Sequence, residues 1–264
     1  MDVHFECTQC GNCCRDLKLP LTVVEAINWL TDGHSVQIIC EALPWPKEPP
    51  ADDRKAAHRR QRSFAATSGS MPSRVVVILA ANFAGSCPNL MADMRCGIYE
   101  RRPLVCRVYP AEINPFIQLD VARKACPPEA WSVEHPLLLR DGRVVNARVR
   151  ESIRQSRDTD RRNVEIKRRL CMALNLNSTA LADEGFVVHS PDRAGLLTQL
   201  ARTVEKPDVE TVDTQWRFIS NRAETVDSLA VQGALVSIAG ANDKSPYEYL
   251  GFHPPSIGAA NPQL

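Results

Sequence analysis

The sequence lacks any long apolar segment. Its longest apolar run, Val75 to Ala81, is far shorter than the roughly 20 residues that a transmembrane helix needs. The first residues show neither the basic region nor the apolar core of a secretory signal peptide. We therefore expect a cytoplasmic protein, in which a reduced thiol pool opposes structural disulfides.

An excess of charge of one sign is also lacking. The 32 Lys and Arg residues against 31 Asp and Glu give a net charge of +1, which provides no argument for binding to nucleic acid or to a membrane. No Gly-rich phosphate loop, H-E-x-x-H or G-x-S-x-G motif occurs. The sequence therefore names no substrate or reaction, and it leaves open both whether the chain is an enzyme and whether it has a protein partner.

Cysteine, in contrast, is abundant, with ten residues in the chain. Cys7, Cys10, Cys13 and Cys14 are spaced C-x2-C-x2-C-C near the start. Thiolates are soft ligands that suit zinc and iron–sulfur clusters, and Gly11 allows the tight loop that turns two sulfurs toward one centre. Because adjacent side chains tend to diverge, Cys13 and Cys14 are expected to have different roles. We interpret this segment as half of a metal site.

A second group of cysteines occurs farther along the chain, beside Gly, Pro and Arg. Its members are Cys87, Cys96, Cys106 and Cys126. Cys87 and Cys126 are each followed by proline, a step also found at a ligand of bacterial ferredoxin-type clusters, although the full ferredoxin spacing is missing. Cys40 and Cys171 lie in apolar surroundings and are expected to be small buried hydrophobic residues rather than ligands.

Taken together, these residues resemble a bacterial family of cysteine-cluster proteins that is named for its C-x-x-C-x-x-C-C signature and described as zinc- or iron-chelating. The matching positions are Cys7, Cys10, Cys13, Cys14, Cys87-Pro88, Cys96-x-Ile98-Tyr99-x-x-Arg102-Pro103-x-x-Cys106-Arg107-x-Tyr109-Pro110 and Cys126. Some relatives are described as iron–sulfur proteins, and one branch is associated with methylation of flagellin lysines. The carboxyl-terminal half matches no family that we can name.

Three functions are consistent with this pattern. The first is an iron–sulfur protein with a redox or group-transfer role, and the second is a structural zinc module that supports protein interaction. The third, a protein lysine methylase-like activity, follows from the resemblance alone, because the C-x3-C-x2-C spacing of radical S-adenosylmethionine enzymes is missing. Adjacent Cys13 and Cys14 and the Cys-Pro steps favour an iron–sulfur cluster over zinc. Eight thiols permit one four-cysteine cluster with spare ligands or two four-cysteine zinc sites.

Some residues next to the cysteines could assist the ligands without binding metal. Arg102 and Arg107 bracket Cys106 and could offset its negative charge or donate hydrogen bonds to sulfur, although ion pairs elsewhere explain them equally well. Tyr109 could shield the site from water, or simply pack in the core. His4 lies near the first cysteine group, but a lone histidine is not expected to be a ligand.

The predicted fold is mainly α with few short strands. An irregular, cysteine-rich metal-binding domain, residues 1–136, would pack on a helical carboxyl-terminal region, residues 137–264, with a disordered tail from residue 254. Residues 44–74 form a proline-rich, basic insertion, which we interpret as a solvated loop or exposed helix rather than a site for an anionic partner.

Local signals support individual elements. Thr22 and Glu25 have capping-box spacing and predict a helix over residues 22–31. Residues 35–43 are a weaker helix or strand, and residues 74–79 are a short buried strand. A D-G turn predicts a hairpin over residues 136–145. Helices are expected over residues 146–175, from Ser190 to residue 204, and over residues 213–239 with a break near Gly233.

Overall fold

The computed structural model describes residues 2–205, 214–240 and 245–255, and the chain divides into two compact units. The first unit combines Met1–Ser35 with Ala80–Arg161, and the second combines Val36–Leu79 with Arg162–Leu264. Each unit is thus built from two separate segments, whereas the division expected from the sequence, 1–136 and 137–264, is contiguous.

The prediction of a mainly α fold is wrong. Across the residues that the structure describes, six α-helices accompany two sheets, one of three strands and one of nine. Residues 213–239, expected to be helical, contain β10 (Arg217–Ser220), α6 (Ala223–Val231) and β11 (Val236–Ile238). The strands were overlooked because three or four residues carry too little alternation to reveal a period of two.

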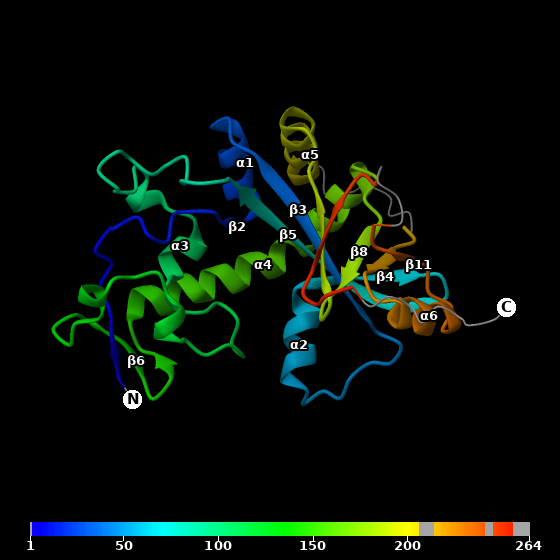
Figure 1. Ribbon diagram of the computed structural model, residues 1–264, viewed down its shortest axis with the longest axis horizontal. Coiled ribbons are helices and arrows are strands. Elements are labelled where there is room, and N and C mark those ends of the chain that lie inside the picture. The colour runs from blue at the N-terminus through cyan, green and yellow to red at the C-terminus, as the bar shows by residue number, and fades with distance from the viewer. Residues whose placement is uncertain (1, 206–213, 241–244, 256–264) are drawn as a thin grey trace. The chain divides into compact units, whose positions relative to one another are not determined.

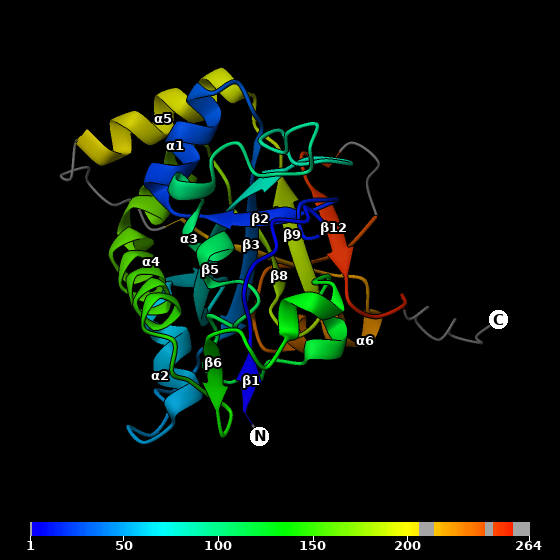
Figure 2. The same ribbon diagram turned by 90° about the vertical axis from the view of Figure 1, so that its left-hand side faces the viewer.

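The second unit holds most of the larger sheet, whose strand order is β11-β10-β8-β3-β5-β2, where β5 is Met71–Asn82 and β2 is Lys18–Leu21. Its central strand, β3 (Val36–Pro44), is parallel to β8 (Ser178–Leu181) and antiparallel to β9 (Gly185–His189). β8, β10 and β11 are parallel, and β9 pairs with β12 (Glu248–Gly251), the red strand beside it in Figure 2. β3 is buried almost throughout, which explains its continuous apolar run and settles the helix-or-strand alternative for residues 35–43.

The expected basic insertion is part of this unit's regular structure. It contains the exposed helix α2 (Arg54–Gln61), strand β4 (Ser63–Ser68) and the start of β5 (Met71–Asn82), which pairs antiparallel with β4. α2 buries none of its side chains, consistent with the solvated helix expected there. The helix predicted from Ser190 is α5 (Arg193–Glu205).

The first unit has little regular structure. Its small sheet, β1-β6-β7, joins β1 (Val3–His4) to the hairpin of β6 (Leu137–Arg140) and β7 (Arg143–Val144), and Figure 1 shows β6 near the amino terminus. The hairpin is the one predicted from Asp141-Gly142, and both turn residues have positive φ. A small core of Val108, Ala111, Leu138, Leu139 and Ile153 lies behind it.

Two helices of this unit begin within a residue of where the sequence predicts. α1 (Val23–Thr31) has the complete capping box of Thr22 and Glu25. α4 (Ala147–Ala173), predicted over 146–175, starts here and continues into residues of the second unit. The unit also contains β2 (Lys18–Leu21), the short α3 (Leu104–Val108) and 3-10 turns at Tyr99–Arg101, Val121–Arg123 and Pro128–Trp131.

Two further expectations concern the ends of the chain and the membrane. Most of the tail predicted to be disordered, residues 256–264, lies outside the described residues. Over the described ranges, no helix has both the length and the apolar character that crossing a membrane would require.

Candidate metal centre

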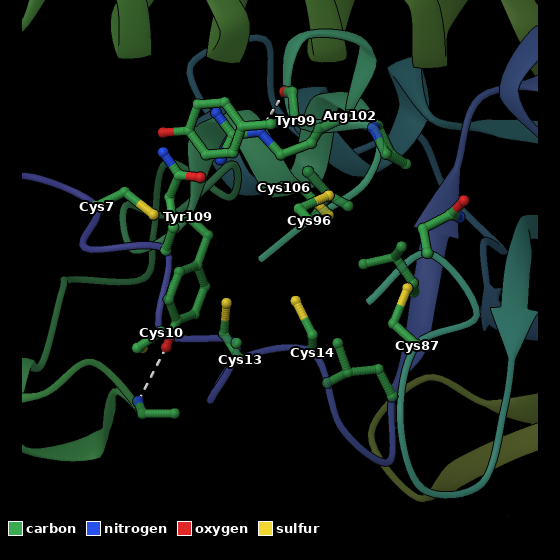
Figure 3. A pocket seen from close by; sticks show the side chains of 18 of the residues that line it. Cys7, Cys10, Cys13, Cys14, Cys87, Cys96, Tyr99, Arg102, Cys106 and Tyr109 are labelled. Carbon is green, nitrogen blue, oxygen red and sulfur yellow. Dashed lines mark hydrogen bonds between the residues drawn. The ribbon is translucent and has the colours of Figure 1, made fainter. Parts of the chain in front are cut away.

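The two cysteine groups meet at a single cavity of the first unit, with a volume of about 260 Å³. All eight cysteines predicted as ligands line this cavity, although four strands and two helices separate Cys14 from Cys87 along the chain. Figure 3 shows the thiols of Cys13 and Cys14 pointing into the same opening that Cys96 and Cys106 face from the other side. The structure therefore brings the predicted residues together; whether they bind a metal stays a prediction.

The first group is arranged by a tight turn at Gly11. Its φ is +72°, and the Cys14 amide donates to the Gly11 carbonyl at 2.9 Å. A Cβ at this position would lie 2.8 Å from the Met94 carbonyl oxygen, so a side chain is excluded by contact as well as by backbone conformation. Gly11 thus has the role expected from the sequence, that of folding the chain between two cysteines.

Backbone hydrogen bonds join the second cysteine group to the first. The Cys87 amide donates to the Cys14 carbonyl at 2.8 Å, and Asp16 and Gly85 are linked by two further hydrogen bonds of 2.8 and 2.6 Å. A β-bridge between Leu90 and Cys96 brings the next cysteine to the same place. These contacts bring the backbone of Cys14, Cys87 and Cys96 together, whereas the directions of the three thiols depend on side-chain rotamers.

Cys106 is presented by α3, whose amino terminus is held by Glu25. One carboxylate oxygen of Glu25 accepts from the Leu104 amide at 2.8 Å, and the other accepts from the Thr22 amide at 2.8 Å. Glu25 thus completes the cap of α1 and satisfies an otherwise unpaired amide of α3. The capping box could be predicted from the sequence, but the hydrogen bond from the Leu104 amide to Glu25 could not.

We expect Glu25→Ala to lower the free energy of unfolding by about 1–3 kcal/mol, because it removes a cap and leaves a partly buried amide without an acceptor. Urea denaturation monitored by circular dichroism measures this change. Glu100→Ala, at an exposed site on a 3-10 turn, is the matched control and should stay within about 0.5 kcal/mol of the natural sequence. Equal effects of the two substitutions would contradict the role of Glu25.

Cys126 lies beside Tyr109. The Ala125 amide donates to the Tyr109 hydroxyl at 2.9 Å, the dashed bond at the lower left of Figure 3, and the same hydroxyl is hydrogen-bonded to the Cys126 thiol. Lys124 approaches the ring of Tyr109 at 5.4 Å and pairs with Glu112 at 2.6 Å. Tyr109 therefore orients the end of this segment as well as covering the cavity.

The two arginines singled out from the sequence are placed differently. Arg102 lines the cavity, its guanidinium lies 3.6 Å from the centre of the Tyr99 ring, and its Nε donates to the Tyr99 carbonyl at 2.8 Å. Arg107 does not line the cavity, and its Nε donates to the Arg102 carbonyl at 2.7 Å. Arg102 can act on the thiols directly, whereas Arg107 can act only through the backbone of Arg102.

The surroundings keep several thiols protonated. Burial, and after it the neighbouring thiols, raise the pKa of the Cys106 thiol to about 12 against an opposing effect of Arg102. A hydrogen bond with Cys13, followed by burial, raises the pKa of the Cys14 thiol well above its usual range. Burial is also the main cause of the raised pKa values of Cys87 and Cys126. Neutral thiols can gather without mutual repulsion, and a bound cation would then displace their protons.

The expectation that Cys13 and Cys14 diverge is wrong. Their side chains share a hydrogen bond, and Figure 3 shows both thiols directed into the cavity. The hydrogen bond from the Cys14 amide to the Gly11 carbonyl closes a turn over residues 11–14, and both cysteines lie at the end of this turn.

The donor set suits a soft metal. None of the described residues that line the cavity is Asp, Glu or His, so sulfur is the only strong ligand available. Within the described ranges, no three His, Cys, Asp or Glu side chains are grouped closely enough to hold an ion as they stand. The thiols therefore fit a zinc or iron–sulfur centre in kind and in number, and binding requires them to draw together by side-chain rotation.

The remaining cysteines and His4 are outside this site. Cys40 and Cys171, both in the second unit, are buried and hydrogen-bonded to each other, as expected for residues that are not ligands in the cavity. All ten cysteines are free of disulfide bonds. His4 does not line the cavity, and its Nδ1 lies 2.7 Å from the His135 carbonyl oxygen.

The sequence did not reveal the wall of the cavity. Besides the thiols, apolar side chains from separate segments enclose it, among them Leu19, Trp29 and Phe83, and Lys18 adds a cation. Each is an ordinary apolar or basic residue in its local context, and no spacing relates them to the cysteines. Only the folded chain places them around the thiols.

Metal retention is expected to weaken as the pH falls. Since burial raises the pKa of Cys87, Cys106 and Cys126, these thiols hold their protons at neutral pH until a metal displaces them. Acidification reverses this exchange, by about tenfold in affinity per pH unit for each proton released. Competition with a chelator at a series of pH values measures the slope. Retention that does not change between slightly alkaline and slightly acidic pH would show that thiolates are not the ligands.

Comparison with known families supports the class of site that this geometry defines. A family model named CxxCxxCC, described as a "Putative zinc- or iron-chelating domain", matches residues 6–127. The match agrees with the resemblance seen in the cysteine pattern, and the matched range contains all eight cysteines of the cavity. No curated protein and no solved structure matches the chain.

Proposed function

We propose that this protein holds an iron–sulfur cluster through its clustered cysteine thiolates and uses it in a redox or group-transfer role. The observation that carries the proposal is the convergence of eight thiols, from two distant segments, on one cavity with no carboxylate or imidazole in its described lining. Such a donor set selects soft ions and clusters over magnesium or calcium.

The size and lining of the cavity support a cluster over a single zinc ion. Its volume of about 260 Å³ is several times the roughly 30 Å³ that one water molecule occupies in the liquid, so there is room for a group of several atoms. Its apolar wall would limit solvent access, one of the factors that tune the potential of an iron–sulfur cluster. When bound, such a cluster supplies an electron donor and acceptor.

The chain's own residues have distinct tasks in this proposal. The thiolates bind, Arg102 offsets part of their negative charge, and the rings of Tyr99 and Tyr109 exclude water from one side of the cavity. The Tyr109 hydroxyl additionally holds Cys126 in position. A cytoplasmic location, where thiols stay reduced, is part of the same proposal.

A structural zinc module is the second candidate, because a sulfur-only donor set suits zinc equally well and the family description names both metals. Zinc would stabilise the first unit without electron transfer, and the cysteine segments of this unit contain little regular structure. A protein partner would then bind the surface whose conformation the metal stabilises.

Purification without oxygen, followed by metal and acid-labile sulfide analysis and visible absorption, separates the two candidates. The proposal predicts a coloured protein with iron and sulfide in similar amounts, bleached by a reductant or by air. A colourless protein with stoichiometric zinc and no sulfide would overturn the iron–sulfur assignment in favour of zinc.

A further inference from the structure

We propose that the eight thiols form two adjacent four-thiol metal centres rather than one centre with spare ligands. One centre is built by Cys14, Cys87, Cys96 and Cys106, and the other by Cys7, Cys10, Cys13 and Cys126. The inference rests on the proposed metal-binding function, but not on the choice between iron and zinc.

The members of the first centre are mutual neighbours. The backbone hydrogen bond from Cys87 to Cys14 and the bridge between Leu90 and Cys96 place three of them together. The Cys106 thiol interacts electrostatically with the thiols of Cys14, Cys87 and Cys96, and the Cys87 thiol interacts with those of Cys14 and Cys96. No thiol of the second centre is among the groups with the largest electrostatic effect on Cys106 and Cys87.

The members of the second centre gather around Tyr109. The Cys126 thiol is hydrogen-bonded to the Tyr109 hydroxyl and interacts with the thiols of Cys10 and Cys7. The same hydroxyl is influenced by Cys13. In Figure 3, Cys7, Cys10 and Tyr109 lie on the left of the cavity, Cys87 lies on the right, and Cys96 and Cys106 lie between them, above Cys14.

Adjacent Cys13 and Cys14 connect the two sets. Figure 3 shows their thiols next to each other, Cys13 toward Cys10 and Cys14 toward Cys87, so each can serve the set on its own side. This arrangement gives the doubled cysteine a reason, because a single centre binds no more than about four protein thiols. Two sets of four use every thiol in the cavity.

The cations near the two sets differ. Arg102 lines the cavity near Cys106, in the first set. Lys124 lies two residues before Cys126, in the second set, and pairs with Glu112 at 2.6 Å. Four thiolates around a divalent ion leave net negative charge, which Arg102 can partly offset in the first set.

Cobalt(II), which gives coloured tetrahedral thiolate sites, can count the centres in the full-length chain. Anaerobic titration of the natural sequence should end at two cobalt ions per chain, with four sulfur ligands per ion by X-ray absorption. Cys106→Ser and Cys126→Ser should each retain one ion in the presence of a competing chelator, and the double variant should retain none. Cys171→Ala, outside the cavity, should retain two.

An endpoint of one cobalt ion per chain in the natural sequence would overturn the two-centre inference. This test needs no variant, so it does not depend on whether the serine variants fold. Loss of both ions from a single variant whose circular dichroism is native would also contradict it. Iron and sulfide in the natural protein test the proposed function separately. Two cobalt sites with no native iron would support the two-centre inference and contradict the iron–sulfur proposal. One cobalt site with native iron and sulfide would support the iron–sulfur proposal and contradict the two-centre inference.

Discussion

Cys106→Ser is expected to lower the metal content and the soluble yield of the protein together. Cys106 is supplied by α3 to a buried part of the cavity, and a serine hydroxyl is a hard, weakly acidic group that replaces a thiolate poorly. A structural metal contributes on the order of 10 kcal/mol to folding, comparable to the whole stability of a typical domain. Metal analysis and the soluble fraction after expression measure both effects. Cys10→Ser should behave in the same way.

Cys171→Ala is the matched control. Cys171 is 1% exposed, lies in the second unit and contacts Cys40 rather than the cavity. Alanine leaves no unpaired hydroxyl there, so we expect unchanged metal content and a loss of roughly 1 kcal/mol from the smaller side chain. If Cys106→Ser kept its full metal content and a normal melting temperature, Cys106 would not be a ligand.

Removal of the metal is expected to loosen the first unit selectively. Its cysteine segments, between residues 5 and 17 and between 83 and 98, contain almost no regular structure. The second unit has fully buried side chains along its own sheet, including Ile38, Phe218 and Ile219. A strong chelator should therefore remove order from the first unit far more than from the second.

Hydrogen exchange read by mass spectrometry after chelation measures this difference. Peptides covering residues 5–17 and 83–126 should exchange at least about tenfold faster, whereas peptides of β3, β8 and β10 should change little, since local opening free energies are set by local packing. The Cys171→Ala protein serves as a loaded reference with an intact cavity. Uniform acceleration in both units, or none in either, would contradict a metal-dependent first unit.

Short-range signals account for the elements that could be predicted from the sequence. α1 follows from the reciprocal hydrogen bonds of Thr22 and Glu25, and the β6–β7 hairpin from the positive φ that Asp141 and Gly142 accept. In contrast, β8 and β10 gain their stability from pairing within a sheet centred on β3, more than 130 residues earlier in the chain. Nothing in Ser178–Leu181 or Arg217–Ser220 alone indicates that partner, and so a mainly α fold was predicted.

The candidate site, like the fold, could be predicted from the sequence only in part. The cysteines could be selected from spacing and neighbouring residues, because a run such as Cys7 to Cys14 has few uses besides binding metal. Their division into two sets depends on long-range contacts, such as the amide of Cys87 on the carbonyl of Cys14. Arg102 and Arg107 looked equivalent in the sequence, and only the fold places one of them in the cavity.

X-ray absorption at the metal edge of protein purified without oxygen tests the central claim most directly. The account predicts that sulfur is the only type of atom bound to the metal, with four sulfur ligands for each centre, and that the metal is lost when Cys106 and Cys126 are both replaced by serine. A metal bound mainly by oxygen or nitrogen, or a pure and folded protein that contains none, would contradict it.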